Sequence, residues 1–210
     1  MSSLLVGLLV VMLVPLFVAT WRTSLLGLAV QGLLIASIAE QGMPAHRAIG
    51  DWITLVDLGV VRGVVAPLVI HRVLARKDVP PRSDVVPPNL LSWTFALGLV
   101  LVAFRFAERL EPAPGAPRTL VAVAGAGVLL GMFVLATQTG VVSQVIGALR
   151  IENAIALLEV GSGAHHAPIG LHAAKVLIVV LTVALFRWYV ERLVPGPATE
   201  VAAGPPEPTL

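Results

Sequence analysis

Residues 141–160 read VVSQVIGALRIENAIALLEV, an apolar stretch that is interrupted by charged side chains. Its length matches the roughly 20 residues that an α-helix needs to cross the hydrocarbon core of a bilayer. Glu152 lies near the middle of the stretch, and Glu159 follows seven residues later. Because an α-helix turns by about 100° per residue, Gln144, Glu152 and Glu159 fall on one face. We expect that face to contact protein or water, since a charge exposed to lipid is costly.

The whole chain has the composition of an integral membrane protein. Of its 210 residues, 57% are hydrophobic and 12% are charged, and its mean hydropathy is +0.93. Soluble domains carry about 25% charged residues, so this composition excludes a soluble or a disordered chain. The net charge of +2 reflects few charges of either sign, and we expect no nucleic-acid binding. The chain has no cysteine, which excludes disulfides and thiolate metal sites.

The apolar stretches predict an all-α integral membrane protein, a bundle of about seven transmembrane helices in a single domain, residues 1–192. The first stretch lacks a signal-peptide cleavage site, so we expect it to be retained as a helix. Polar, proline-rich segments at 75–89 and 111–118 read as loops, and 193–210 as a disordered tail. The first three and last three helices are consistent with two parallel three-helix repeats joined by one helix. The predicted helices cover residues 3–20, 24–39, 51–74, 90–107, 119–139, 141–160 and 168–190.

The distribution of Lys and Arg between the loops predicts the orientation. Cytoplasmic loops of membrane proteins carry an excess of positive side chains. With the N-terminus outside, seven such residues lie on the inner side and three on the outer side. We therefore predict an outer N-terminus and a cytoplasmic C-terminus. The inner residues are Arg22, Arg72, Arg76, Lys77, Arg82, Arg187 and Arg192, and the outer ones are Arg47, Arg109 and Arg118.

Charged residues inside the predicted helices are the candidate functional residues. A charge at the bilayer centre costs about 2.5–3.5 kcal/mol on insertion scales, so such residues usually have a partner or a role. We expect Glu152 to pair with Lys175 of the following helix. Burial and mutual charge allow such a pair to change its protonation state. This predicts a proton path through Glu152 and Lys175, with His172 and Glu159 as access residues.

Asp57 and Arg62 form a second set of intramembrane charges, five residues apart in one predicted helix. For both sets the alternative is a purely structural role, in which ion pairs hold the bundle together without moving protons.

The histidines do not suggest a metal centre. Transmembrane haem needs two histidines at matching depth on facing helices. His71 and His172 lie toward opposite faces of the membrane, and the consecutive His165 and His166 point apart. We therefore expect no metal and no cofactor bound to this chain.

Three sequence stretches resemble a known family. The stretch VVSQVIGALRIENA at 141–154 resembles hydrogenase-4 component E, a family related to the K subunit of respiratory complex I and to a small subunit of multi-subunit cation/proton antiporters. RGVVAPL at 62–68, a basic residue followed by a proline, and WRTSLLGLAVQGLLIASI at 21–38 resemble the same family. The resemblance covers most of the chain up to Arg192, with 118–192 as the K-subunit-like part.

The resemblance implies a membrane subunit of a hydrogenase-4 or complex-I-like proton-coupled oxidoreductase, with no redox centre of its own. Its partners would be antiporter-like and other membrane-arm subunits and, through the complex, a soluble redox module. Glu152 is similar to the family's intramembrane carboxylate. The complex I subunit carries its glutamate about one turn earlier, where this chain has Leu149. Ala174 and Lys175 stand where that subunit has a second glutamate, so a two-carboxylate relay does not carry over.

Two other functions are compatible with the same residues. One is a stand-alone secondary ion transporter, whose charges would bind a coupling ion. The other is a membrane scaffold that anchors a soluble partner. In each case we expect a multi-pass protein of the cell inner (plasma) membrane.

Overall fold

The computed structural model is all-helical apart from two short strands. It describes residues 2–17, 20–76, 83–84, 90–110, 117–161 and 168–193. In chain order the elements are α1 (Ser2–Phe17), α2 (Trp21–Gly42), α3 (Ile49–Leu55), the π-helix η1 (Val56–Val65), α4 (Ala66–Ala75), β1 (Ser83–Asp84), α5 (Leu90–Arg109), α6 (Arg118–Thr137), β2 (Gln138–Thr139), α7 (Val141–Gly161) and α8 (Ile169–Leu193).

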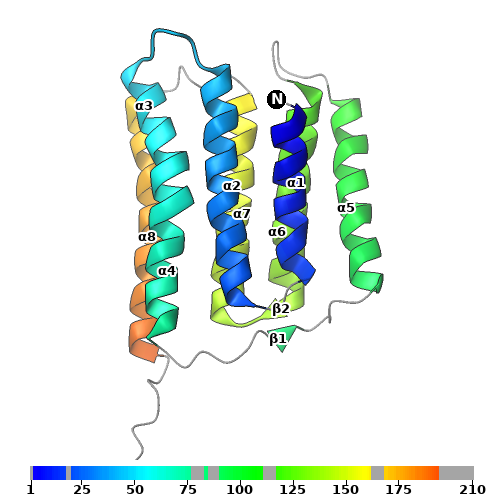
Figure 1. Cartoon of the computed structure of the whole chain (residues 1–210), viewed down its shortest axis with the longest axis vertical. Coiled ribbons are helices and arrows are strands. Elements are labelled where there is room, and N and C mark those ends of the chain that lie inside the picture. The colour runs from blue at the N-terminus through cyan, green and yellow to red at the C-terminus, as the bar shows by residue number, and fades with distance from the viewer. Residues whose placement is uncertain are drawn as a thin grey trace, which may run out of the picture.

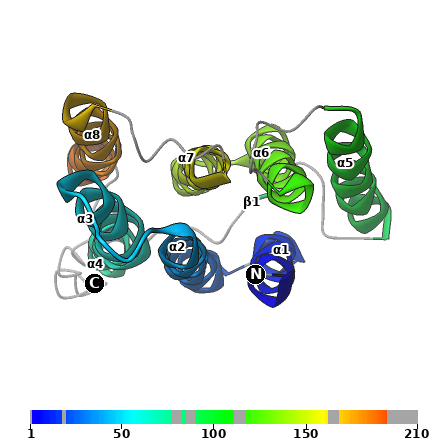
Figure 2. The same ribbon diagram turned by 90° about the horizontal axis from the view of Figure 1, so that it is seen from above.

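The helices stand side by side and run up and down the long axis of the molecule (Figure 1). Seen from above, they form two rows (Figure 2). One row holds α8, α7, α6 and α5, and the other holds the continuous α3–η1–α4 rod, α2 and α1. The N-terminus and the last turn of α8 lie at opposite ends of the bundle (Figure 1).

Six helices are long and apolar enough to cross a membrane, namely α2, the α3–η1–α4 rod, α5, α6, α7 and α8. The predicted all-α, multi-pass fold is therefore confirmed. α1 is apolar but shorter, at 16 residues. The seventh span and the two-repeat layout stay predictions.

Several predicted boundaries are wrong by two or three residues. α2 begins at Trp21 and continues through Gly42, where the turn-forming residues from Glu40 onward suggested an earlier end, and α8 continues to Leu193. α6 ends at Thr137, two residues before its predicted end, because Gln138–Thr139 pairs with Ser83–Asp84 of the predicted 75–89 loop as a two-stranded antiparallel sheet. Gly140, with φ of 124°, then turns the chain into α7. The predicted tail, beyond Leu193, lies outside the described residues, as do His165 and His166.

Two apolar clusters hold the rows together. The first joins α1, α2, α6 and α7 around residues such as Leu8, Ile35 and Leu157. The second joins α2, α4, α7 and α8 around Ile70, Leu149 and similar side chains, at the end of the bundle where the β1–β2 pair lies. The charged residues of interest lie on the other side of this second cluster, toward the start of α3.

Small residues allow the closest helix crossings. In α6, Gly127 and Gly131 lie against Ala154 and Ile151 of α7, and their small-x-x-x-small spacing allows the two helices to pack closely. α2 crosses η1 at Gly32, where an added Cβ would lie 2.7 Å from the Cα and the N of Gly63.

We predict that Gly32→Ala destabilises the bundle by about 1–3 kcal/mol, because neither backbone can yield without moving a helix. Gly59→Ala is the matched control on the same crossing, since its Cβ would make an ordinary 3.5 Å contact with the Cβ of Ala36. The free energy of unfolding in detergent micelles measures both. Equal stability of the two variants would contradict the close crossing.

The bundle also predicts the sides on which its loops emerge. Single cysteines at Ala45, between α2 and α3, and at Ser83 of β1 should react with a membrane-impermeant maleimide from opposite faces, Ser83→Cys from the cytoplasm. The cysteine-free chain gives no background labelling. Labelling of both positions from one side would show that the α3–η1–α4 rod does not span the bilayer.

Candidate functional site: an intramembrane charge cluster

The π-helix η1 brings Asp57 and Arg62 into contact. In a π-helix each N–H bonds the carbonyl five residues back, as the Ala66 N–H does to the Val61 carbonyl. Residues five apart therefore lie on the same face of the helix, as residues four apart do in an α-helix. In an α-helix the same two side chains would point about 140° apart. The Arg62 Nε donates to the Asp57 Oδ2 at 2.9 Å, and both side chains are buried.

Arg62 also connects the rod to α7. Its Nη1 donates to the Asn153 Oδ1 at 3.4 Å and lies 4.0 Å from the Glu152 Oε2. The Glu152 Oε1 accepts from the Thr182 hydroxyl of α8 at 3.5 Å. Glu152 therefore lies where η1, α7 and α8 meet, near the middle of α7.

Lys175 of α8 pairs with Glu159, at 2.7 Å between Nζ and Oε2, and not with Glu152 as predicted. The direction of the side chains explains the difference, because every Cα–Cβ bond tilts toward its helix N-terminus. α7 and α8 are antiparallel, so Glu159 and Lys175 lean toward each other. Glu152 leans away from Lys175 toward the level of Arg62. The prediction that Lys175 is the cation beside Glu152 is therefore wrong, because Arg62 lies nearest and Lys175 pairs with Glu159. All of these side chains nevertheless belong to one cluster.

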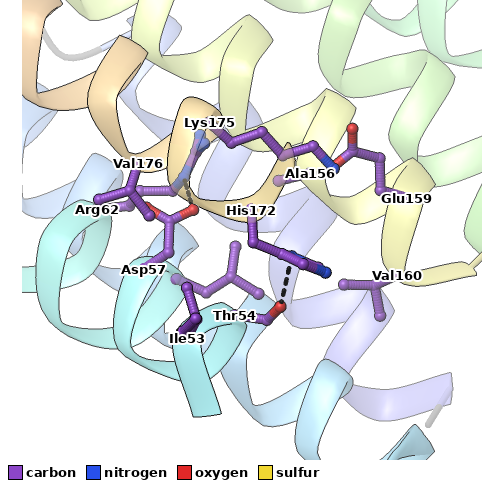
Figure 3. A pocket seen from close by; sticks show the side chains of 11 residues that line it. Ile53, Thr54, Asp57, Arg62, Ala156, Glu159, Val160, His172, Lys175 and Val176 are labelled. Carbon is purple, nitrogen blue, oxygen red and sulfur yellow. Dashed lines mark hydrogen bonds and ion pairs between the residues drawn. The ribbon is translucent and has the colours of Figure 1, made fainter. Parts of the chain in front are cut away.

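His172 marks the end of the cluster nearest the start of α3. It is buried, and its Nδ1 lies 3.3 Å from the Thr54 hydroxyl (Figure 3). His172 and Lys175 lie on neighbouring turns of α8, so the cluster continues from Thr54 past Lys175 toward Arg62.

Two hollows that share several lining residues accompany these side chains. A cavity of about 40 Å³ lies between η1, α7 and α8, lined by Thr54, Asp57, Arg62, Glu159, His172 and Lys175 among others (Figure 3). A water needs about 10–15 Å³ of such volume, so this cavity, whose lining is partly polar and partly apolar, has room for about three. A second hollow of about 200 Å³ lies between α7 and α8, lined by Arg62, Glu152, Ile155, Ala156, Glu159, Lys175 and Ile178.

The charges around the hollows do not balance. Among the described residues that line them, three carboxylates, Asp57, Glu152 and Glu159, face two cations, Arg62 and Lys175. Several buried polar atoms also lack a hydrogen-bond partner in the described part of the chain, which is costly in a low-dielectric interior. Those in the cluster are the Asp57 Oδ1, Glu152 Oε2, Asn153 Nδ2 and His172 Nε2. The cluster therefore has both an excess of carboxylates among the residues that line the hollows and hydrogen-bonding positions that a water could fill.

Sequence reasoning found the charged members but missed the polar ones. Thr54, Asn153 and Thr182 join the cluster through hydrogen bonds between different helices, and no spacing within one helix signals these. Gln144, placed on the Glu152 face by its spacing, instead donates from Nε2 to the carbonyl oxygens of Leu135 and Gln138 at 3.1 and 2.9 Å. It caps the end of α6 and stays apart from the cluster.

The fold and the cluster together define a multi-pass, all-helical membrane protein with a charged centre between three of its helices. Within the described ranges, no three His, Asp or Glu side chains converge closely enough to hold a metal ion. Comparison with family models, curated proteins and solved structures finds no match for this chain.

We predict that Asp57→Asn lowers the free energy of unfolding by about 3–5 kcal/mol, because it leaves the buried Arg62 without its anion. Asp57→Leu combined with Arg62→Met should recover most of the loss, since apolar replacement of a buried pair is often neutral. At the exposed Arg187–Glu191 pair, Glu191→Gln should change stability by less than about 1 kcal/mol. Denaturation in detergent measures all three. A fully stable Asp57→Asn variant would contradict the anchoring role of the pair.

Proposed function

We propose that this chain is a membrane subunit of a hydrogenase-4 or complex-I-like proton-coupled oxidoreductase, and that Glu152 carries a proton within the membrane arm. The observation that carries the proposal is the unbalanced charge cluster at the depth of Glu152. A proton on one of the three carboxylates would neutralise the excess negative charge without any change in packing.

The surroundings of Glu152 support such a role. The 40 Å³ cavity offers room for water from Thr54 and His172 to the Asp57–Arg62 pair, and the 200 Å³ hollow, which both Arg62 and Glu152 line, offers room for water from there to Glu152. On the opposite side, the apolar cluster around Ile70 and Leu149 separates Glu152 from the β1–β2 end. A proton could therefore approach Glu152 from the α3 end but not through the apolar cluster, and its release would need a structural change or a partner.

The sequence resemblance supplies the setting. In that setting the N-terminus lies outside, the C-terminus lies in the cytoplasm, and the chain works beside antiporter-like subunits in the inner membrane. Redox chemistry would belong to other subunits, and Glu152 would couple it to proton movement. Lys175, Glu159 and His172 would set the electrostatic environment and the access route.

Replacing Glu152 with Gln keeps the size and the hydrogen bonding of the side chain but removes its exchangeable proton. We expect the Glu152→Gln complex to assemble and to catalyse redox turnover, but with proton translocation per electron reduced to the passive leak. Dye-monitored proton movement in inverted membrane vesicles, divided by the rate of redox turnover in the same vesicles, measures the coupling.

Glu191→Gln, on the exposed end of α8, is the matched control and should couple normally. Normal proton translocation in a fully assembled Glu152→Gln complex would overturn the relay. Co-purification separates the rival functions. Large antiporter-like and redox subunits in a stable complex support the proposal, and a functional complex of this chain alone would favour a secondary transporter.

A further inference from the structure

The charged cluster is open on one side at the depth of the bilayer core. Glu152, Lys175 and Glu159 keep 23%, 22% and 35% of their side-chain surface exposed. The exposed side chains of Ile155 on α7 and Ile178 on α8 line the same 200 Å³ hollow. The hollow is therefore a groove in the side of the bundle, which we call the α7–α8 groove, and its floor is charged.

Hydrocarbon chains are a poor cover for this floor. Lipid offers no hydrogen bonds and does not stabilise charges, and ionisable residues within membranes almost always face protein or a water-filled cavity. Glu152 lines the groove with the exposed part of its side chain, so a covering segment would contact a carboxyl group there. A protein segment that covers the groove would therefore have to present a polar group at this depth.

The charge balance indicates which group. Arg62 is already held by Asp57 at 2.9 Å, and Lys175 is held by Glu159 at 2.7 Å. When Glu152 is ionised, the described residues that line the groove offer it only the shared Arg62, at 4.0 Å. A second cation for Glu152 thus has to come from outside these residues.

We infer that the α7–α8 groove receives a transmembrane helix of a neighbouring subunit, and that this helix presents a cationic side chain to Glu152. The inference rests on the proposed function in placing the chain beside other membrane subunits. The partner's cation and the proton on Glu152 would neutralise the same charge, so approach of the cation would favour release of the proton. The neighbouring subunit would thereby supply the step that the chain alone lacks.

Cross-linking from the rim of the groove tests the docking. Ile155→Cys and Ile178→Cys, each in the otherwise cysteine-free full chain, would be labelled with benzophenone maleimide in native membranes and irradiated. Leu177→Cys is the control, because Leu177 is exposed on the same helix but lies about 160° from Lys175, whereas Ile178 lies about 60° from it. Mass spectrometry would identify the attached peptide.

We expect both rim positions to give an adduct with a transmembrane segment of another protein. That segment should carry Lys, Arg or His within one turn of the cross-linked residue, and Leu177→Cys should not give this adduct. Adducts with lipid alone, with a second copy of this chain, or with a helix that has no cationic residue there would each overturn the inference. The cross-linking result does not depend on the coupling of proton translocation to redox turnover. A cation-bearing adduct from a complex without redox subunits would support the docked helix and overturn the proposed oxidoreductase. A lipid-only adduct from a complex that couples redox turnover to proton translocation would overturn the docked helix and support the proposed oxidoreductase.

Discussion

The ion pair between Asp57 and Arg62 is the interaction on which the charged centre depends. A guanidinium in a low-dielectric interior needs a close anion, and the 2.9 Å contact with Asp57 supplies it. The pair forms because η1 is wound as a π-helix, which aligns residues five apart. With its Nε held by Asp57, Arg62 directs Nη1 across the bundle to Asn153 and Glu152. The position of Glu152 relative to a cation therefore depends on the winding of a different helix.

This arrangement gives the two ends of the cluster different properties. Toward the start of α3, the polar cavity with Thr54 and His172 has room for water. Toward the β1–β2 end, the buried apolar side chains of α4, α7 and α8 close the bundle. In the proposed path, a proton would approach Glu152 from the side that has room for water and not through the apolar cluster. The open α7–α8 groove is then the side from which a partner could promote the proposed release.

The sequence was sufficient for the fold class because composition and apolar length decide between water and lipid. It was also sufficient for the charged members of the site, since Asp57, Arg62, Glu152, Glu159 and Lys175 are conspicuous in apolar helices. The sequence was insufficient to predict which of these charged side chains form ion pairs with one another. A fixed 100° rotation per residue separates Asp57 from Arg62, and only the π-helix removes that separation. Helix adjacency favoured Glu152 as the partner of Lys175, whereas the tilt of the side chains favours Glu159.

The other errors have a similar origin. Turn-forming residues after Glu40 did not end α2, because its helical hydrogen bonding continues to Gly42. The strand pair of Ser83–Asp84 with Gln138–Thr139 joins segments far apart in the chain, and neither segment has a strand-like pattern of its own. Long-range pairing of short segments leaves no local signal.

In the proposed function, an exchangeable proton on Glu152 neutralises the excess negative charge of the cluster. Infrared difference spectroscopy of the full chain in lipid nanodiscs, recorded in H₂O and in D₂O, tests it most directly. We predict a carbonyl band of a protonated carboxyl group that shifts in D₂O, disappears in Glu152→Gln and persists in Glu191→Gln. A spectrum in which no protonated carboxyl band depends on Glu152 would contradict the account.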